Sequence, residues 1–265
     1  MAGDSFDTTV AHPARRYNYW LGGKDNFAAD RANGDAVEAA MPTIRLMAVE
    51  NRRFLGRAAR FLAQQGIRQF LDIGTGIPAP GNTHEVVQAV DPTAKIVYVD
   101  NDPIVLSHAR ALLTSAPSGT VAYLDADLRD PRAILDNAEL RATLDLTQPV
   151  GLLLVAVLHF IRADEDPQGV VDTLLDALPS GSYVVATHAT WEFTPAEAVE
   201  KLTAANPDGR FVPRDGADFV RLFDGLSLIE PGLTSVAHWR SDEEAEQPRP
   251  SAEDVSCFGL VARKP

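Results

Sequence analysis

Hydrophobic residues in the middle of the chain form short runs separated by longer amphipathic stretches. Apolar runs at 69–73, 96–99, 120–124, 151–157 and 182–187 have the length of buried strands. Stretches with helical periodicity lie between them, and several begin with proline, which the first turn of a helix tolerates. The expected helices cover residues 83–90, 103–113, a segment from 131, 167–178, 195–205 and 215–223. Alternating strands and helices predict an α/β fold with a largely parallel sheet.

The C-terminal part of the chain departs from this alternation. Residues 226–230 are a further strand, residues 235–239 extend it or begin a loop, and residues 255–262 are the last strand. No helix is expected immediately before the last strand, so it should run antiparallel to its neighbour. We therefore predict a Rossmann-like sheet of seven strands, mostly parallel, with an antiparallel last strand.

The N-terminal part is predicted to be helical. Periodicity favours helices at 30–40 and 44–65, with Thr43 as the N-cap of the second. The arginines between residues 45 and 60 are interpreted as a solvated helix face. The expected organisation is a cap or lid segment and helix over residues 1–65, and a Rossmann-like domain over residues 66–265, together one compact unit.

Composition narrows the setting and the partners. The chain has 265 residues and one cysteine, Cys257, so an intrachain disulfide is excluded and a reducing compartment is favoured. The apolar run from residue 151 to 161 is too short to span a bilayer, and the first residues are acidic rather than basic. We therefore expect a cytoplasmic protein without membrane contact. A net charge of −13 argues against nucleic acid and leaves small molecules or proteins as partners.

The candidate chemistry centres on the turn that follows the strand at 69–73. Asp72 precedes the turn, and Gly74, Thr75 and Gly76 form it. The next strand ends in Asp100. A strand, a Gly-x-Gly turn and a second strand ending in an acid are typical of a nucleotide-binding βαβ unit.

Two cofactor classes are compatible with such a turn. Gly74-x-Gly76-x-x-Ala79 matches the loose dinucleotide pattern. However, Pro78 and Pro80 delay the following helix, so its N-terminus cannot lie against a pyrophosphate. Asp72 would also repel a pyrophosphate but suits an ammonium or sulfonium group. The antiparallel strands expected at the end of this sheet are also not part of the dinucleotide-binding fold.

These residues resemble the motifs of class I S-adenosylmethionine-dependent methyltransferases. Residues 72–76 are similar to the first motif of that class, and Asp100 to its ribose-binding acid. Asp127 and Leu128 resemble the position that contacts adenine. Three segments resemble a family of bacterial S-adenosyl methyltransferases. They are residues 22–27, which read GGKDNF, residues 81–85 and residues 99–103. The resemblance implies S-adenosyl-L-methionine as the cofactor and leaves the acceptor open.

Each acid has an expected role and a structural alternative. The Asp100 carboxylate can accept hydrogen bonds from both ribose hydroxyls, or it caps the helix that begins at Pro103. Asn101, Asp102 or Ile104 can flank the adenine. Asp127 can accept from the adenine amino group or can cap a helix, and Asp125 competes with it for the ligand.

Two groups upstream and downstream of the turn are further cofactor candidates. The aromatic stretch 17–27 could cover the sulfonium, because aromatic faces attract cations. Tyr19, Lys24 and Asn26 belong to this lid hypothesis, whose alternative is a segment packed on the sheet for stability alone. His84 either lines the cofactor pocket or is structural.

His159 is the candidate catalytic residue. It follows the strand at 151–157, where this class of enzyme places groups that face the acceptor, and it could act as a base or orient the acceptor. The alternative is a buried histidine bonded to backbone. No histidine pair has the spacing of metal ligands, so no metal is expected.

The favoured function is methyl transfer from S-adenosylmethionine to an unidentified small-molecule acceptor. One alternative is a sensor or scaffold that binds S-adenosylmethionine without transferring its methyl group. A less favoured alternative is a nicotinamide-dependent oxidoreductase. The sequence leaves the acceptor, the methylated atom and the oligomeric state open.

Overall fold

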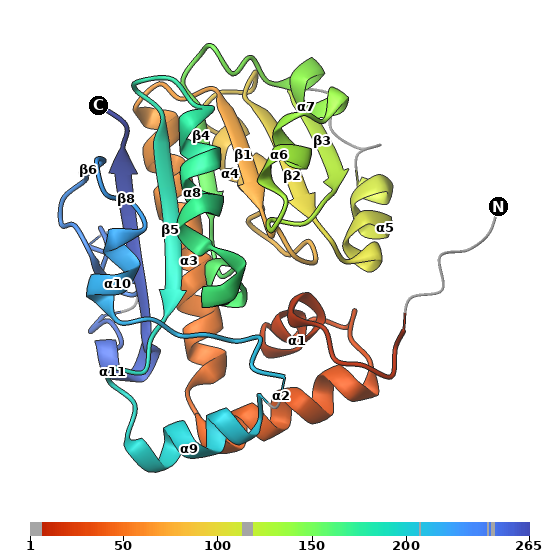
Figure 1. Cartoon of the computed structure of the whole chain (residues 1–265), viewed down its shortest axis with the longest axis vertical. Coiled ribbons are helices and arrows are strands. Elements are labelled where there is room, and N and C mark those ends of the chain that lie inside the picture. Colours follow the sequence, from red (N-terminus) through yellow and green to blue (C-terminus); the bar gives the residue numbers. More distant parts are fainter. Residues whose placement is uncertain (1–6, 113–118, 207, 243, 245–246) are drawn as a thin grey trace.

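One mixed sheet of eight strands runs through the molecule (Figure 1). The computed structural model describes residues 7–112, 119–206, 208–242, 244 and 247–265. The strands are β1 Gln69–Ile73, β2 Lys95–Asp100, β3 Thr120–Asp125, β4 Gly151–Leu154, β5 Tyr183–Ala189, β6 Ser227–Leu228, β7 Thr234–Ser235 and β8 Cys257–Arg263. Their order in the sheet is β3-β2-β1-β4-β5-β8-β6, and β7 also pairs with β8.

The predicted sheet is confirmed, with one difference in its strand count. Strands β1 to β5 are mutually parallel, and β8 is antiparallel to β5 from the pair Tyr183–Arg263 to the pair Ala189–Cys257. Two short strands, β6 and β7, take the place of the single strand expected near residue 226. Pro231 and Gly232 separate them, and Gly232 has the positive φ of a tight turn.

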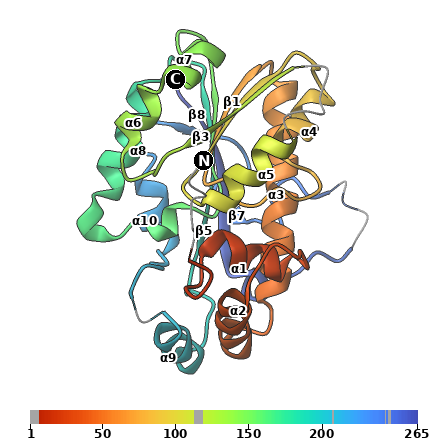
Figure 2. The same ribbon diagram turned by 90° about the vertical axis from the view of Figure 1, so that its right-hand side faces the viewer.

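Helices cover both faces of the sheet (Figure 2). They are α1 Pro13–Trp20, α2 Ala28–Ala40, α3 Ile44–Gln64, α4 Thr83–Gln88, α5 Pro103–Leu112, α6 Pro131–Leu135, α7 Ala138–Thr143, α8 Pro167–Asp176, α9 Ala196–Ala204, α10 Gly216–Arg221 and α11 Ala252–Val255, with 3-10 turns η1 Leu158–Phe160 and η2 Ala163–Glu165. Alternate strand residues face opposite sides. Leu71 and Ile73 join the core under α6, α7 and α8, whereas Phe70 joins the core under α3.

The N-terminal helices lie across the carboxyl ends of the parallel strands. Figure 1 shows α1 and α2 at that end of the sheet, with α9 beside α2. Trp20 of α1 is buried in the core that α3 shares with the sheet. The N-cap residue of α2, Phe27, has no side chain that can cap the helix. Asp30 in the first turn instead accepts a hydrogen bond from the backbone N–H of Phe27 at 2.8 Å. The N-terminal segment therefore packs against the edge of the sheet where ligands bind in α/β folds.

Three details correct the predicted elements. The strand expected at 151–157 ends at Leu154, because Ala156 has φ 56° and donates its backbone N–H to the Thr187 hydroxyl. A one-turn helix, α11, does precede the last strand. Thr43 occupies the N-cap of α3 but makes no capping bond with its side chain. The expected helix end at Leu113 lies outside the described residues.

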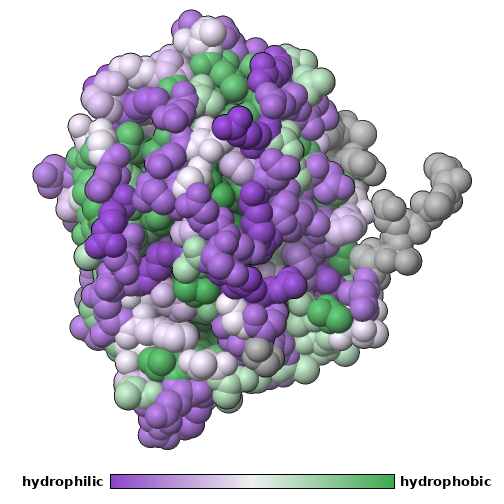
Figure 3. Space-filling view, in the orientation of Figure 1, coloured by the Kyte–Doolittle hydropathy of each residue, from purple (hydrophilic) through white to green (hydrophobic). Residues whose placement is uncertain are grey.

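The surface seen in Figure 3 is mainly hydrophilic, with small, separate hydrophobic areas. Over the part of the chain that the structure describes, only four large hydrophobic side chains are exposed, namely Val10, Val49, Val90 and Leu228. None of the described helices is long and apolar enough to cross a membrane.

Candidate active site

A cavity of about 790 Å³ lies at the carboxyl ends of the parallel strands. Its walls come from the turns after β1, β2, β3 and β4, from α1 and α3, and from residues near 206–211. A volume of this size is typical of a site for small organic ligands. Nine of the predicted site residues line it. They are Asp72, Gly74, Thr75, Gly76, Asp100, Asn101, Asp127, Leu128 and His159.

The glycine turn is fixed to the end of the neighbouring strand. The backbone N–H groups of Gly74 and Thr75 donate to the Val99 carbonyl at 2.8 and 3.2 Å. Gly74 and Gly76 have φ values of +75° and +68°, which favour glycine. A Cβ on Gly74 would lie 2.6 Å from Val157, whereas a Cβ on Gly76 would meet open space. Gly76 is thus the glycine that leaves room for a ligand, and Gly74 makes room for Val157.

Asp100 joins the glycine turn to the end of β2. Its two carboxylate oxygens accept from the backbone N–H groups of Gly76 at 2.7 Å and Asp102 at 2.9 Å. Burial raises the pKa of Asp100, and the two backbone donors oppose this effect. Each carboxylate oxygen keeps a further acceptor position for a ligand hydroxyl.

Asp72 is a buried carboxylate beneath the turn. The Thr83 hydroxyl donates to its Oδ2 at 2.6 Å, and burial raises the pKa of Asp72 to about 6. The positive charge of Arg52 acts in the opposite direction. A cation bound nearby would stabilise the ionised form further.

The residues after β3 form a polar corner of the cavity. Asn101 donates to Asp127 Oδ2 at 2.9 Å, and Arg129 forms an ion pair with Asp127 at 2.8 Å. Leu128 is buried beside them. Asp125, the expected competitor of Asp127, is exposed and is not among the lining residues.

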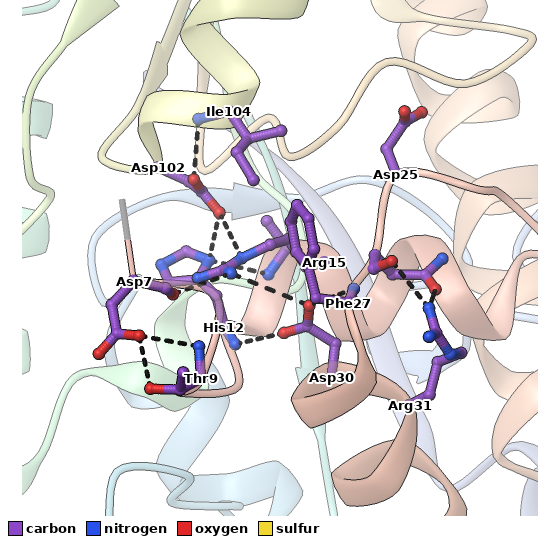
Figure 4. A network of polar contacts seen from close by, with 12 residues as sticks. Asp7, Thr9, His12, Arg15, Asp25, Phe27, Asp30, Arg31, Asp102 and Ile104 are labelled. Atoms are coloured by element: carbon purple, nitrogen blue, oxygen red, sulfur yellow. Dashed lines mark hydrogen bonds and ion pairs between the residues drawn. The ribbon is translucent and has the colours of Figure 1, made fainter. Parts of the chain in front are cut away.

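Charged residues of the N-terminal segment contact the turn after β2 (Figure 4). His12 Nδ1 lies 2.9 Å from Asp102 Oδ2, and Arg15 Nε lies 3.3 Å from the same oxygen. Asp30 accepts from the His12 backbone at 2.8 Å and lies 3.9 Å from Arg15. Asp102, the residue two places beyond Asp100, is therefore the point where the N-terminal segment is attached to the turn after β2.

Four predicted site residues lie away from the cavity wall. The Tyr19 hydroxyl donates to Asp35, and its ring lies under the Arg45 guanidinium at 4.6 Å. Lys24 is exposed. Asn26 donates to Asn18 and to the Gly23 carbonyl. His84 bonds to the Tyr98 hydroxyl at 2.9 Å through Nδ1. Three of the four residues, Tyr19, Asn26 and His84, therefore have partners within the protein.

His159, which follows β4, also lines the cavity. The side chain is 6 % exposed, and its Nδ1 has no hydrogen-bond partner among the described residues. Burial lowers the pKa of His159 well below its usual value, and the charge of Arg16 adds to this effect. The neighbouring His188 is structural, since its ring bonds to the Ala189 carbonyl and to Arg214. His159 is thus a neutral imidazole whose Nδ1 is left without a partner by the part of the chain that the structure describes.

Sequence reasoning missed several polar residues of the wall. Asn51 is buried, and its Oδ1 has no partner in the described part of the chain. Arg52 also lines the cavity, although the sequence suggested a solvated arginine. Asn51 and Arg52 are consecutive on α3, and the interruption of its apolar pattern by Asn51 was the available signal. Arg57 is not solvated either, because it donates to the carbonyls of Val236 and Trp239.

The structure also bears on metals. Among the residues that it describes, no group of three or more His, Cys, Asp or Glu side chains is placed to hold a metal ion.

The sheet order, the glycine turn and the acid at the end of β2 define a Rossmann-like methyltransferase of class I. The family model described as "S-adenosyl methyltransferase" matches residues 1–265, and the chain belongs to this family. The protein is thus an S-adenosylmethionine-dependent methyltransferase whose acceptor is unidentified. No curated protein matches it.

Solved structures agree with this assignment. A DUF574 family protein from Streptomyces avermitilis is 44% identical, with 98% of this chain and 99% of that chain covered and a TM-score of 0.89. A proposed methyltransferase from Thermobifida fusca is 38% identical, with 97% and 96% covered and a TM-score of 0.88. Magnesium protoporphyrin IX methyltransferase from Synechocystis, solved with S-adenosylhomocysteine, is 15% identical, covers 94% and 93%, and has a TM-score of 0.55, which shows a shared fold.

Proposed function

We propose that the enzyme methylates a small molecule bound at the His159 end of the cavity, with S-adenosylmethionine at the glycine-turn end. The observation that carries this proposal is the continuity of the cavity. The same cavity is lined by the strand-end acids Asp72 and Asp100 and by His159, whose Nδ1 has no hydrogen-bond partner among the described residues. Two ligands held in one cavity can react without the entropic cost of a chance encounter.

The residues at the glycine-turn end fit the cofactor. Asp100 supplies acceptor positions for the ribose hydroxyls, and Gly76 leaves open space beside it. Asn51 Oδ1 is an unused acceptor for an ammonium group. Arg52 has no carboxylate within 4.0 Å among the described residues, so it can pair with the carboxylate of the methionine moiety. Asp72 contributes a negative charge toward the same end.

The acceptor end needs a group that can hold or take a proton. When bound, the cofactor supplies a methyl group whose carbon–sulfur bond breaks as the acceptor–carbon bond forms, with sulfur keeping the electron pair. His159 is neutral because its pKa is depressed. It can therefore accept a hydrogen bond from the acceptor, orient it, and take the proton that the acceptor loses.

The N-terminal segment is proposed to act as a lid. Residues of α1 line the cavity, and His12 and Arg15 attach the segment to Asp102. The division into a cap over residues 1–65 and a domain over residues 66–265 belongs to the same proposal. Deletion of residues 1–28 should lower the affinity for S-adenosylmethionine, measured by calorimetry. Equal affinity of the shortened and the full chain would assign the segment a purely structural role.

Two further points rest on the sequence. The resemblance of residues 22–27 to one bacterial methyltransferase family stays a prediction. A cytoplasmic location is also proposed, and it is supported by a single, buried cysteine in a chain that cannot form an intrachain disulfide.

The decisive experiment measures binding and turnover separately. Calorimetry with S-adenosylmethionine and with NAD(H) should show binding of the first only. Incubation with S-adenosylmethionine and a library of small-molecule acceptors should then release S-adenosylhomocysteine. Tight NAD(H) binding without a response to S-adenosylmethionine would overturn the proposal. Binding of S-adenosylmethionine with no turnover for any acceptor would favour a sensor.

A further inference from the structure

The arginines of the cavity wall differ in whether the protein neutralises them. Five arginines line the cavity, namely Arg15, Arg16, Arg52, Arg129 and Arg210. Three of them form ion pairs with carboxylates within 4.0 Å: Arg15 with Asp102 and Asp30, Arg129 with Asp127 and Glu165, and Arg210 with Asp208. Among the described residues, Arg16 and Arg52 have no carboxylate within that distance. The carboxylates of Asp208 and Asp30 act on the charge of Arg16 only from farther away. A buried guanidinium that contacts no carboxylate is costly unless a ligand pairs with it.

The charges of these two arginines act on different groups of the cavity wall. The charge of Arg52 acts on Asp72, beneath the glycine turn, and its NH2 group reaches the Ala79 carbonyl in that turn. The charge of Arg16 acts instead on His159. Arg52 is therefore placed for the carboxylate of the cofactor, and Arg16 for an anionic group of the acceptor.

Arg16 is held in place by neutral groups. One of its terminal nitrogens donates to Asn33 Oδ1, and its guanidinium lies over the Trp20 ring at 5.2 Å. Its Nε is buried without a hydrogen-bond partner in the described part of the chain. Desolvation lowers the pKa of Arg16 to about 10, which leaves it charged at neutral pH. The side chain thus presents a fixed, charged donor that an anion can satisfy.

The surroundings of Arg16 and His159 are aromatic. The ring centroid of His159 lies 4.5 Å from that of Phe160 and 4.8 Å from that of Phe211. The backbone N–H of Val212 donates to the His159 carbonyl at 2.7 Å, which holds the Phe211 segment against η1. Trp191 lines the same cavity. Aromatic walls favour a planar, aromatic ligand through stacked and edge-to-face contacts.

We propose that the acceptor is an aromatic carboxylate whose carboxylate pairs with Arg16 and whose ring lies against His159, Phe160 and Phe211. This inference rests on the proposed function, because it assumes that the glycine-turn end holds the cofactor. A single guanidinium suits a monoanion, and its planar fork matches a carboxylate with two parallel hydrogen bonds.

The test measures binding to the complete chain in the presence of saturating S-adenosylhomocysteine. The probes are 4-hydroxybenzoate and 3-hydroxy-2-naphthoate, with phenol, 2-naphthol and butyrate as neutral and non-aromatic counterparts. Calorimetry should show at least one of the aromatic carboxylates binding about 10-fold or more tightly than its neutral counterpart and than butyrate. Equal or tighter binding of both neutral compounds would overturn the inference.

Paired variants then assign the effect to Arg16. Arg16→Gln should abolish the preference for the carboxylate while leaving the affinity for S-adenosylhomocysteine within about twofold, and Arg16→Lys should restore part of the preference. Arg52→Gln should do the reverse, weakening S-adenosylhomocysteine and sparing the preference. Arg60→Gln, an exposed change on α3 away from the cavity wall, is the control for general effects. A loss of S-adenosylhomocysteine affinity in Arg16→Gln with an intact preference would overturn the assignment.

The two proposals fail in different ways. If S-adenosylmethionine and S-adenosylhomocysteine both fail to bind the unaltered protein, the proposed function is wrong. If they bind but no aromatic carboxylate does so more tightly than its neutral counterpart, only the inference about the acceptor is wrong. Should Arg16→Gln fail to fold, the probe series on the unaltered protein and the Arg16→Lys variant still decide the question.

Discussion

The two ends of the cavity are built in different ways. At the cofactor end, Gly76 and Asp100 are joined by hydrogen bonds between backbone and carboxylate at adjacent strand ends. At the acceptor end, Arg16, His159 and Phe211 come from three distant segments of the chain. Strand pairing fixes the first end, whereas side-chain packing assembles the second. The sheet therefore fixes the end proposed for the cofactor, and the added segments shape the end proposed for the acceptor.

Asp100→Ala should have the largest effect on the cofactor end. The change removes the proposed ribose acceptor and leaves the backbone N–H groups of Gly76 and Asp102 without this partner. We expect the affinity for S-adenosylmethionine to fall by about 10- to 100-fold, measured by calorimetry.

The control for this change is Asp125→Ala. Asp125 is the register partner of Asp100 on β3, but it is exposed and does not line the cavity. Its removal should leave the affinity unchanged. If both variants bind S-adenosylmethionine as well as the unaltered chain does, the ribose has been misplaced.

Asp72→Asn should separate binding from stability. The folded-state pKa of Asp72 is raised from 3.8 to about 6. The protonated carboxyl therefore contributes to the free energy of unfolding below pH 4, and this contribution is lost as the pH rises through 6. Ionised Asp72 thus costs the folded protein about 3 kcal/mol at pH 8. The variant should gain about 2 kcal/mol in the free energy of unfolding at pH 8 and little at pH 4. Chemical denaturation at both pH values measures this difference.

The same variant should bind the cofactor less well. The ionised Asp72 carboxylate attracts the cationic end of S-adenosylmethionine, so Asp72→Asn should lose about 10-fold in affinity at pH 8 and less at pH 5. Thr83→Val, which removes the hydroxyl that bonds to Asp72, serves as a comparison. A stability difference that does not change with pH would contradict the raised pKa.

Gly74→Ala and Gly76→Ala should differ although both glycines have positive φ. The added methyl group at residue 74 would lie 2.6 Å from Val157, whereas at residue 76 it would meet open space. We expect Gly74→Ala to cost about 1–2 kcal/mol more in the free energy of unfolding, measured by thermal or chemical denaturation. Gly76→Ala should instead act mainly on cofactor affinity. Equal losses of stability would mean that Val157 moves aside without cost.

The sequence was informative where a strand end determined the site. Asp72, Gly76 and Asp100 could be predicted because the carboxyl ends of neighbouring parallel strands meet at one edge of a sheet. Arg16 and Asn51 could not, because their role depends on how α1 and α3 pack and on which partners packing denies them. The end of β4 was also missed, since an apolar run does not reveal that Ala156 leaves the sheet at a positive φ.

The segment at residues 22–27 shows how a motif can be recognised and its role still depend on packing. It wraps around Asn18, a buried residue of the cavity wall, whose Oδ1 accepts from the Asp25 backbone at 3.1 Å and from Asn26 at 3.0 Å. A Cβ on Gly23 would collide with the Asn18 side chain at 2.2 Å. The second glycine therefore serves the packing of Asn18.

Lys24→Ala is expected to have the smallest effect. Lys24 is exposed in the same segment and does not line the cavity, so its removal should change the affinity for S-adenosylmethionine by less than about twofold. Asn26→Ala, which removes the bonds to Asn18 and Gly23, should cost more. Calorimetry on both variants measures the difference. A loss of more than about fivefold for Lys24→Ala would mean that the segment closes onto the bound cofactor, and the cofactor end would then depend on the N-terminal segment as strongly as the acceptor end does.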